Sequence, residues 1–521
     1  MLIRRLLICL LLLGSLLALP FWFRKHEGIT PADENADRLV IITAHNKSVR
    51  DEYDREFRKY YREKFGKDIV LDFRSTGGTS DIMRYIEDRY QAAFRTYYEQ
   101  KFGKWDAAYA TVFNNDSHAG HPVRRLFMES DVSIGIDIFA GGGTFNQLRV
   151  ARKGYAVDGK VRERHPEYFK EDSIPAFFGG EALYDQQGRY YGVVLSTFGI
   201  LYNIDRMKEI PDCKAPETWQ DLGKPEFFGK LVIADPSKSG SANKCFEIVI
   251  QQYMGQANDP VRGWRDGLNM IKRIFANART VTDSASKVVR DVAIGEAAAG
   301  MAIDTYGYTE VEWSRRIFNG KSHVVYVTPK GGTAVSTDPV QILRGAPNRV
   351  AAERFVDFLL SLEGQKLHAF KMGAPGGGVK SSISRPAIRK ELYAPEYRQY
   401  RFEADYDPYA SGSDFVYHPQ WTGRYYSLIQ MVIKSVMLEV HEELQRAWQA
   451  IIAAGGPEKV PQAWACFNKL PFEYTEAAQM AKKLRISKEN SAADVAGTLR
   501  QWSVFAKENY IKAAELAREG K

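Results

Sequence analysis

The chain has 521 residues, of which 45% are hydrophobic and 12% aromatic, so it is long enough for two or three packed domains. Its formal net charge of +8 is modest for this length. The sequence contains no block of lysines and arginines of the kind that follows a nucleic-acid backbone. These values exclude an intrinsically disordered chain and argue against a nucleic-acid partner.

The N-terminal segment, residues 1–24, is expected to direct export. Arg4 and Arg5 precede an apolar run over residues 6–23, which is typical of an export signal and just long enough to span a bilayer. No small-residue cleavage site follows the run, so a cleaved signal peptide and an uncleaved signal anchor both stay open. The arginines favour a cytoplasmic N-terminus, which places the folded part of the chain outside the cytoplasm.

Export would bring three cysteines, Cys213, Cys245 and Cys466, into a compartment where disulfides persist. Cys213 and Cys245 are the pair that would form if any does, but their spacing matches no zinc or redox motif. Three free, buried thiols are the simpler expectation.

Strands alternate with helices from residue 38 onward. Residues 39–44 predict a buried strand that ends at His45, and the amphipathic helix after it stops at Gly66. Residues 69–73 predict a second strand, which runs through a glycine-rich turn into another helix. This order predicts an α/β domain with a parallel sheet and right-handed crossovers.

Three turns rich in glycine and hydroxyl side chains each precede a predicted helix. Glycine lets the backbone approach a ligand, and the free N–H groups of a helix start favour negative charge. Open α/β sheets bind ligands at the carboxyl ends of their strands. The turns therefore predict an oxyanion site, although one such turn alone is also an ordinary connection. Their members are Ser75, Thr76, Gly77, Gly78, Thr79, Gly142, Gly143, Thr144, Ser239, Gly240 and Ser241.

Later segments predict how the domains are joined. Residues 191–203 form a strand-like run longer than a typical strand of about five or six residues, and such a run can pass between domains. Residues 300–304 predict a strand that delivers Tyr306 and Tyr308, and residues 323–329 predict a strand that returns to the first domain. The chain after the glycines at 376–378 is expected to be helical, with one long amphipathic helix over residues 421–454.

Taken in chain order, the predicted strands, turns and helices resemble those of the extracellular solute-binding proteins of bacterial ABC importers. The resemblance is to the branch with ferric-ion, phosphonate, sugar-phosphate and thiamine receptors. The resemblance covers about residues 38–395. The segment 84–130 and the tail after about residue 400 depart from the family's pattern. The matching motifs are LVIITAHN, FRSTGG, DIFAGGG, YYGVVLSTFGILYN, ETWQDLGKPEFFGKLVIADPSKSGSA, SASKVVRDVAIGEAAAGMAIDTYGY and VVYVTPKGGTAVSTDPVQILRGAPN.

The resemblance implies an α/β protein with the periplasmic binding protein type II fold, whose two lobes close on a solute. We expect residues 38–195 with 325–393 in the first lobe, residues 197–322 in the second, and residues 400–521 in a C-terminal helical extension. The implied protein is a monomeric periplasmic or extracytoplasmic receptor that delivers its solute to an ABC permease in the inner membrane. An uncleaved N-terminal segment would anchor it there. No cofactor and no catalytic residue is expected.

The resemblance also implies that the solute lies between the lobes. The turns at 75–79 and 142–144 would donate from the first lobe and the turn at 239–241 from the second. His45 and Tyr306 would contact the non-anionic part of the solute, and Ser196 and Asp304 complete the predicted site.

Several alternatives remain. Ferric receptors of this branch hold the metal with a histidine, a carboxylate and two adjacent tyrosines, and the matching positions here are His45, Asp81, Tyr306 and Tyr308. Tyr-Gly-Tyr stands where the family has Tyr-Tyr. An exported hydrolase is an alternative of another class, although the sequence has no G-x-S-x-G, H-E-x-x-H or C-x-x-C motif. A third alternative is a receptor whose C-terminal tail binds a membrane partner other than a permease, such as a sensor.

Overall fold

The computed structural model describes residues 36–411, 414–487 and 490–521. The predicted export segment, residues 1–24, lies outside this part of the chain. None of the helices in the described ranges is both long and apolar enough to cross a bilayer.

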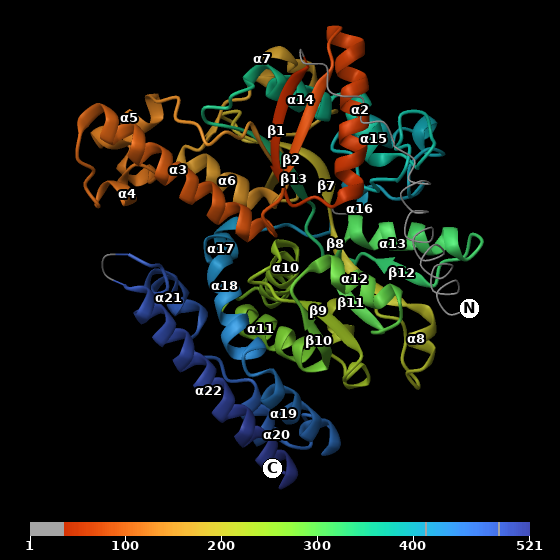
Figure 1. Ribbon diagram of the computed structural model, residues 1–521. Helices are drawn as coiled ribbons and strands as arrows, with labels where there is room; N and C mark the ends of the chain where they lie inside the picture. The colour runs from red at the N-terminus through yellow and green to blue at the C-terminus, as the bar shows by residue number, and fades with distance from the viewer. Residues whose placement is uncertain (1–35, 412–413, 488–489) are drawn as a thin grey trace, which may run out of the picture.

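Two open β-sheets form the centres of two α/β lobes (Figure 1). The first sheet has the order β2-β1-β3-β13-β4, with β7 also paired to β13, and the second has the order β10-β9-β11-β8-β12. The two-lobed α/β prediction is confirmed. The strands of the first sheet are β1 (Asp37–Thr43), β2 (Ile69–Arg74), β3 (Ile138–Ala140), β4 (Ala156–Val157), β7 (Tyr191–Ser196) and β13 (Ser336–Leu343). Those of the second are β8 (Phe198–Asn203), β9 (Leu231–Ala234), β10 (Ala278–Thr282), β11 (Ala299–Ile303) and β12 (Val324–Val327).

Helices cover both sheets, and a small hairpin of β5 (Phe177–Phe178) and β6 (Glu181–Ala182) lies beside the first. The helices of the first lobe are α2 (Lys47–Phe65), α3 (Thr79–Phe102), α4 (Tyr109–Val112), α5 (Pro122–Glu129), α6 (Gly143–Lys153), α7 (Val161–Arg164), α14 (Arg349–Leu360) and α15 (Leu362–Ala369). Those of the second lobe are α8 (Ile204–Lys208), α9 (Trp219–Leu222), α10 (Gly240–Ala257), α11 (Pro260–Asn277), α12 (Ala285–Ala293) and α13 (Asp304–Ile317).

The chain passes between the sheets twice. The long run over residues 191–203 divides at Thr197, with β7 paired to β13 in the first sheet and β8 paired to β11 in the second. The return differs from the prediction, because β12 pairs with β8 and so stays in the second sheet. The lobe boundary placed at residue 325 is therefore wrong. The chain crosses back after Val327, where Pro329 breaks the strand pattern.

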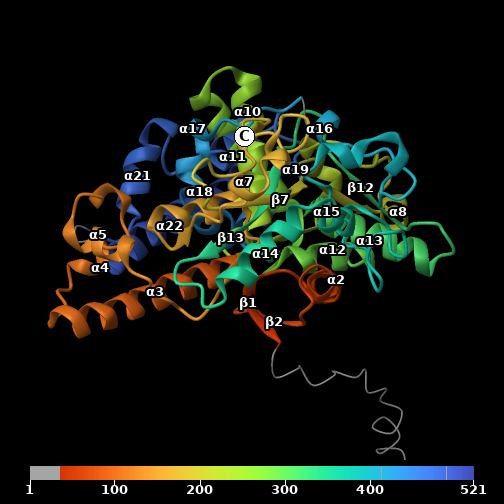
Figure 2. The ribbon, with the colours of Figure 1, turned by 90° about the horizontal axis from the view of Figure 1, so that it is seen from above.

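The segment 84–130 forms a projection of the first lobe. Helix α3 runs far beyond the sheet, and α4 and α5 fold back beside it (Figures 1 and 2). Phe94, Phe113 and Phe127 are fully buried there, with ring centroids about 5 Å apart. Tyr90 of α3 stacks on Tyr155, with centroids 4.4 Å apart, and so attaches the projection to the lobe. The aromatic residues of this segment thus build a core of their own.

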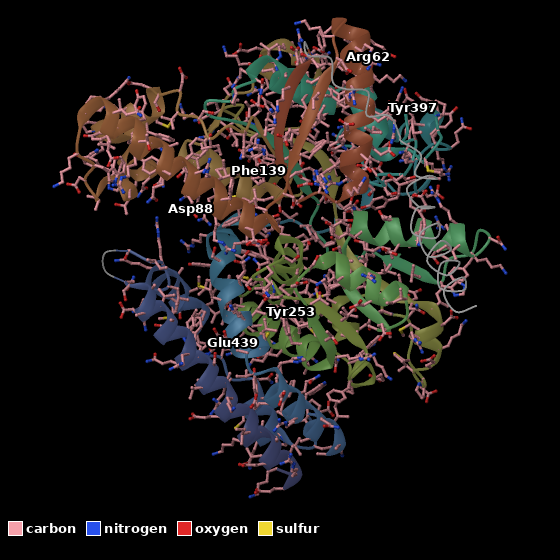
Figure 3. The ribbon with its side chains drawn as sticks, viewed as in Figure 1. Arg62, Asp88, Phe139, Tyr253, Tyr397 and Glu439 are labelled. Carbon is pink, nitrogen blue, oxygen red and sulfur yellow. The ribbon has the colours of Figure 1, made fainter. Side chains whose placement is uncertain are left out.

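The tail is helical, as predicted, but its long helix is interrupted. The predicted helix over residues 421–454 is wrong as one element, because a π-helical turn (Lys434–Leu438) and a non-helical Val440 divide it. Glu439, labelled in Figure 3, accepts a hydrogen bond from Ser503 beside this break. The helices are α16 (Pro408–Ser411), α17 (Pro419–Thr422), α18 (Tyr426–Ile433), α19 (His441–Ala453), α20 (Pro461–Phe467), α21 (Ala477–Lys483) and α22 (Ala492–Arg518).

One hydrophobic core joins the tail to the second lobe. Trp264 and Phe275 of α11 belong to the same buried cluster as Trp448 of α19 and Tyr510 of α22. Lys272 of α11 is buried in this interface and donates hydrogen bonds to two carbonyl oxygens of the tail. The tail is therefore packed as part of the second lobe, and it lies along that lobe in Figure 1.

The three cysteines of the described chain, Cys213, Cys245 and Cys466, are free thiols. The disulfide considered between Cys213 and Cys245 does not form. Cys245 and Cys466 are buried and Cys213 is half-buried, which agrees with the simpler expectation.

Candidate functional site

The three predicted donor turns meet where the two lobes face each other. A Cβ atom on Gly142 would lie 2.8 Å from Cγ2 of Thr79, so the first and second turns are in contact. A Cβ atom on Gly78 would lie 3.1 Å from the carbonyl oxygen of Lys238, next to the third turn. Gly142 has φ +88° and also faces the ring of Phe139, which Figure 3 labels, so only glycine fits there without strain.

Two of the predicted N–H donors are already bonded to carboxylates of the chain. The N–H of Gly78 donates to Oδ2 of Asp81 over 3.2 Å, and the N–H of Gly143 donates to Oδ1 of Asp338 over 3.3 Å. In the third turn, Oγ of Ser239 accepts from the N–H of Ala242. The first two helix starts therefore hold negative charge, as expected from the helix dipole. An incoming anion would compete with Asp81 or Asp338 or use the neighbouring N–H groups.

A cluster of His45, Asp338 and Arg385 lies against the second turn. Nε2 of His45 is 2.9 Å from Oδ2 of Asp338, and Nη1 of Arg385 lies 3.2 Å from the same Nε2. Nη2 of Arg385 donates to Asp338 in a close ion pair. The side chain of Arg385 is only 6% exposed, so the protein holds a cation almost out of water here. A Cβ on Gly141 would lie 2.9 Å from Nε2 of His45, which puts the cluster against the backbone.

The charges of this cluster stabilise one another. Burial alone would raise the pKa of Asp338, but Arg385 and His45 hold that pKa well below its usual range. Burial would likewise lower the pKa of Arg385, and Asp338 holds it above its usual range instead. Asp338 and Arg385 are therefore both ionised at neutral pH.

Several buried polar atoms of the described residues still lack a partner at this site. They include Nε of Arg385 and Nδ1 of His45. Nε2 of His45 cannot donate to Asp338 and accept from Arg385 at once, so one of these two contacts is also unsatisfied. Thr144 and Ser196, two predicted site residues, have buried hydroxyl oxygens without partners among the described residues. A ligand with acceptor oxygens would satisfy these groups.

A neutral histidine supports the cluster from behind. His368 is fully buried; its Nδ1 donates to the carbonyl oxygen of Gly364, and Tyr53 donates to its Nε2, both over 2.7 Å. These two bonds require the tautomer that carries its proton on Nδ1. Burial and, secondarily, the nearby Arg385 lower the pKa of His368 to about 3. The ring of Tyr53 in turn contacts the ring of His45 edge-on.

This arrangement predicts a loss of stability in mild acid. Unfolded His368 takes up a proton near pH 6.5, whereas the folded protein resists until about pH 3. The unfolded state thus binds more protons between these values, so the free energy of unfolding should fall by up to about 1.4 kcal/mol per pH unit below pH 6.5. Urea unfolding between pH 7.5 and 4.5 should show a weaker dependence in His368→Gln than in the wild type. Equal slopes for the two proteins would contradict this role.

The structure separates the two tyrosines of the ferric alternative. The strand predicted before Tyr306 is confirmed as β11, but α13 begins at Asp304, so both tyrosines lie in a helix. Tyr306 and Tyr308 are two positions apart, and side chains at that spacing in an α-helix point about 200° apart around its axis. The two rings therefore face different surroundings. Burial raises the pKa of Tyr306, which lies in the field of Arg385. Tyr308 instead packs against Tyr326, with ring centroids 4.8 Å apart.

The remaining predicted residues lie in different settings. Asp81 forms an ion pair with Arg84 besides accepting from Gly78, so it is not directed at His45. Asp304 is fully buried under the crossing at Thr197, and burial raises its pKa to about 7. Ser75, Thr76 and Gly77 are exposed. The described residues include no group of three histidine, cysteine or acidic side chains that could hold a metal ion.

Arg385 and Asp338 were not predicted from the sequence. Asp338 stands before Pro339 in β13, whose sequence STDPVQIL begins with polar residues, so no local pattern marks it as a member of a buried ion pair. Arg385 lies in a loop outside regular structure, and its sequence neighbours give no indication of a site.

Comparison with known proteins gives a consistent result for the centre of the chain. Residues 165–392 match the family described as bacterial extracellular solute-binding protein. An uncharacterized protein of Haemophilus influenzae is 30% identical over 235 residues, which cover 44% of this chain and 60% of that protein. The phosphoglycerate transport regulatory protein PgtC of Salmonella typhimurium is 27% identical over 209 residues, which cover 40% of this chain and 47% of PgtC. The chain thus spans about half the length of these curated relatives.

Among solved structures, the periplasmic binding protein AfuA of Actinobacillus pleuropneumoniae with fructose-6-phosphate bound is 20% identical. The match covers 76% of this chain and 99% of AfuA, with a TM-score of 0.48.

Proposed function

We propose that the chain, whose residues 165–392 match the bacterial extracellular solute-binding protein family, is the receptor of an ABC importer for a small solute that carries phosphate or another oxyanion. The solute would lie between the lobes, against the donor turns and Arg385. The receptor would act as a monomer in the periplasm and deliver its solute to a permease in the inner membrane. Its role is binding rather than catalysis.

One observation carries this proposal. The carboxylate of Asp338 accepts from the N–H of Gly143 at the start of α6 while it pairs with the buried Arg385. An oxyanion is thus already bound here by a helix start and a guanidinium, which is the combination that recognises phosphate and carboxylate groups. The unpartnered Nε of Arg385 and the hydroxyl of Thr144 offer further donors to a solute.

A phosphorylated solute is favoured over other oxyanions by the similarity to PgtC, whose name refers to phosphoglycerate transport. Phosphate also offers more acceptor oxygens than a carboxylate, which suits three donor turns that meet at one place. We further propose that the first lobe comprises about residues 38–195 with 336–393, and the second about residues 198–327.

Native mass spectrometry of the protein purified from its own host tests this proposal. We expect a bound mass that corresponds to a phosphorylated acid or sugar and is lost on unfolding. A bound polyamine or a bound ferric ion in its place would contradict the oxyanion proposal. The unfolded protein provides the matched control, because adducts that do not depend on the site persist in it.

The second candidate function is that of a partner for a membrane sensor. The name of PgtC describes a transport regulatory protein, and the helical tail packs against the second lobe as an addition to the family's pattern. The two functions separate in a host that lacks this chain but expresses the permease from a constitutive promoter. A receptor is required for uptake even then, whereas a sensor partner is not.

A further inference from the structure

The first part of the tail runs along both lobes before it joins the second. We call the described residues 401–411 and 414–426 the strap. Tyr409 donates to the carbonyl oxygen of Ile388 over 2.6 Å, and the N–H of Tyr417 donates to the carbonyl oxygen of Gly179 over 2.8 Å. Just before these contacts with the first lobe, Tyr406 shares a hydrogen bond of 2.7 Å with Thr197, where the chain crosses between the sheets.

The same strap is bonded to α10 of the second lobe. The hydroxyls of Tyr417 and Thr422 both donate to Oε1 of Glu247, each over 2.7 Å. Gln251, one turn further along α10, donates to the hydroxyl of Thr422. Tyr417 therefore binds the first lobe with its backbone and the second lobe with its side chain.

Under Tyr417, a buried ion pair joins the lobes directly. Nζ of Lys244, on α10, lies 2.6 Å from Oε1 of Glu181 and 3.2 Å from Oε2 of Glu247. It also lies 3.5 Å from the centre of the Tyr417 ring. Glu181 is on β6, and the residues that follow pack in the core of the first lobe. Because Glu181 and Lys244 are largely buried, moving the lobes apart breaks their ion pair, and an ion that stays buried without its partner is strongly unfavourable.

The far end of the strap reaches the candidate site. The ring of Tyr426 stacks on Phe145 of α6, with centroids 4.5 Å apart. Its hydroxyl donates to the carbonyl oxygen of Gly240, in the third donor turn, over 2.7 Å. Phe145 follows Thr144 of the second donor turn, so Tyr426 lies between donor turns of opposite lobes.

From these contacts we propose that the strap controls exchange of the solute by holding the two lobes together. Opening the site requires the Glu181–Lys244 ion pair and the Phe145–Tyr426 stack to separate while the strap stays bound to the second lobe through their common core. This inference rests on the proposed function in one respect only, namely that a solute is exchanged between the lobes. The tie between the lobes exists whatever the solute is.

Distance measurement on the solute-free full chain tests the tie. Spin labels would be placed by Glu63→Cys in the first lobe and Lys208→Cys in the second, both exposed. Cys213→Ser removes the half-buried thiol, and Cys9→Ser removes the cysteine outside the described residues. The labelled protein with an unaltered strap should give one narrow distribution of distances between the two labels. Glu181→Gln, which removes the charge on the first lobe, should shift the distribution to longer distances. An unchanged distribution in Glu181→Gln would overturn the proposal.

A control variant and a hydrogen-exchange measurement test whether the shift is caused by loss of the tie between the lobes. Asp357→Asn removes an ion pair with Arg164 that lies within the first lobe, so it should leave the distribution unchanged. In the wild type, the amide of Tyr417 should be as protected from hydrogen exchange as amides of α10. Exchange at the rate of an exposed loop would overturn the proposal without any variant. Titration with 3-phosphoglycerate is independent of both measurements, and its failure would count against the proposed function alone.

Discussion

Replacing Arg385 by glutamine is expected to weaken binding of a phosphorylated solute about 100-fold. A hydrogen bond to a charged group contributes about 1.5–3 kcal/mol, and each 1.4 kcal/mol changes the affinity tenfold. Arg385→Gln removes the guanidinium and leaves Asp338, its present partner, as an unpaired negative charge beside the solute. Both effects act against an anion, so the loss should appear in calorimetric titration with 3-phosphoglycerate.

Arg389 offers a matched control on the same segment. Its side chain is only 9% exposed and forms an ion pair with Glu391, away from the donor turns. Arg389→Gln should therefore leave the affinity within a few-fold of the wild type. Arg385→Lys should give an intermediate affinity, because lysine keeps the charge but loses the planar fork of donors. If Arg385→Gln and Arg389→Gln bind equally well, Arg385 is not part of the site.

Adding a carboxylate at Gly78 should nearly abolish binding of an anion. Gly78 has φ −73°, so any residue can adopt its backbone conformation, and a side chain there would project toward Lys238 between the turns. A negative charge in that place would occupy the position that we assign to the solute. Gly78→Asp should therefore bind 3-phosphoglycerate too weakly for calorimetry to detect.

Gly78→Asn separates charge from bulk. Its side chain has the same shape and the same contact with the carbonyl oxygen of Lys238, so it carries the same steric penalty. A charge at a helix N-terminus changes the interaction by up to about 2 kcal/mol, so Gly78→Asn should bind roughly 10- to 30-fold more tightly than Gly78→Asp. Equal affinities would show that bulk, not charge, disrupts the turn, and that the turn does not bind an anion.

The parts of this fold that could be predicted depend on local patterns. Residues 39–44 and 69–73 are apolar strand runs, and β1 and β2 form there as a parallel pair. Glycines at 77 and at 142–143 mark the helix starts of α3 and α6, because their positive φ angles allow turns that would strain other residues. The meeting of the first two donor turns could be predicted because parallel strands place their carboxyl ends at one edge of a sheet.

What could not be predicted depends on contacts between distant segments. The sequence of β12 is suitable for either sheet, and only its pairing with β8 shows that the chain crosses back later. Asp304 and Tyr306 follow an apolar strand, but Asp304 accepts from the N–H groups of Thr197 and Thr305 and so begins a helix. Arg385 reaches His45 across 340 residues of sequence. No periodicity carries that information.

Calorimetric titration of the purified protein with 3-phosphoglycerate, with and without a metal chelator, tests the central claim most directly. We predict binding of one solute per chain that is unaffected by the chelator and absent in Gly78→Asp. The contrary result is an absence of binding for 3-phosphoglycerate, together with a visible charge-transfer band that appears on adding ferric citrate and disappears in Tyr306→Phe. That outcome would identify the chain as a ferric receptor and contradict an oxyanion site between the lobes.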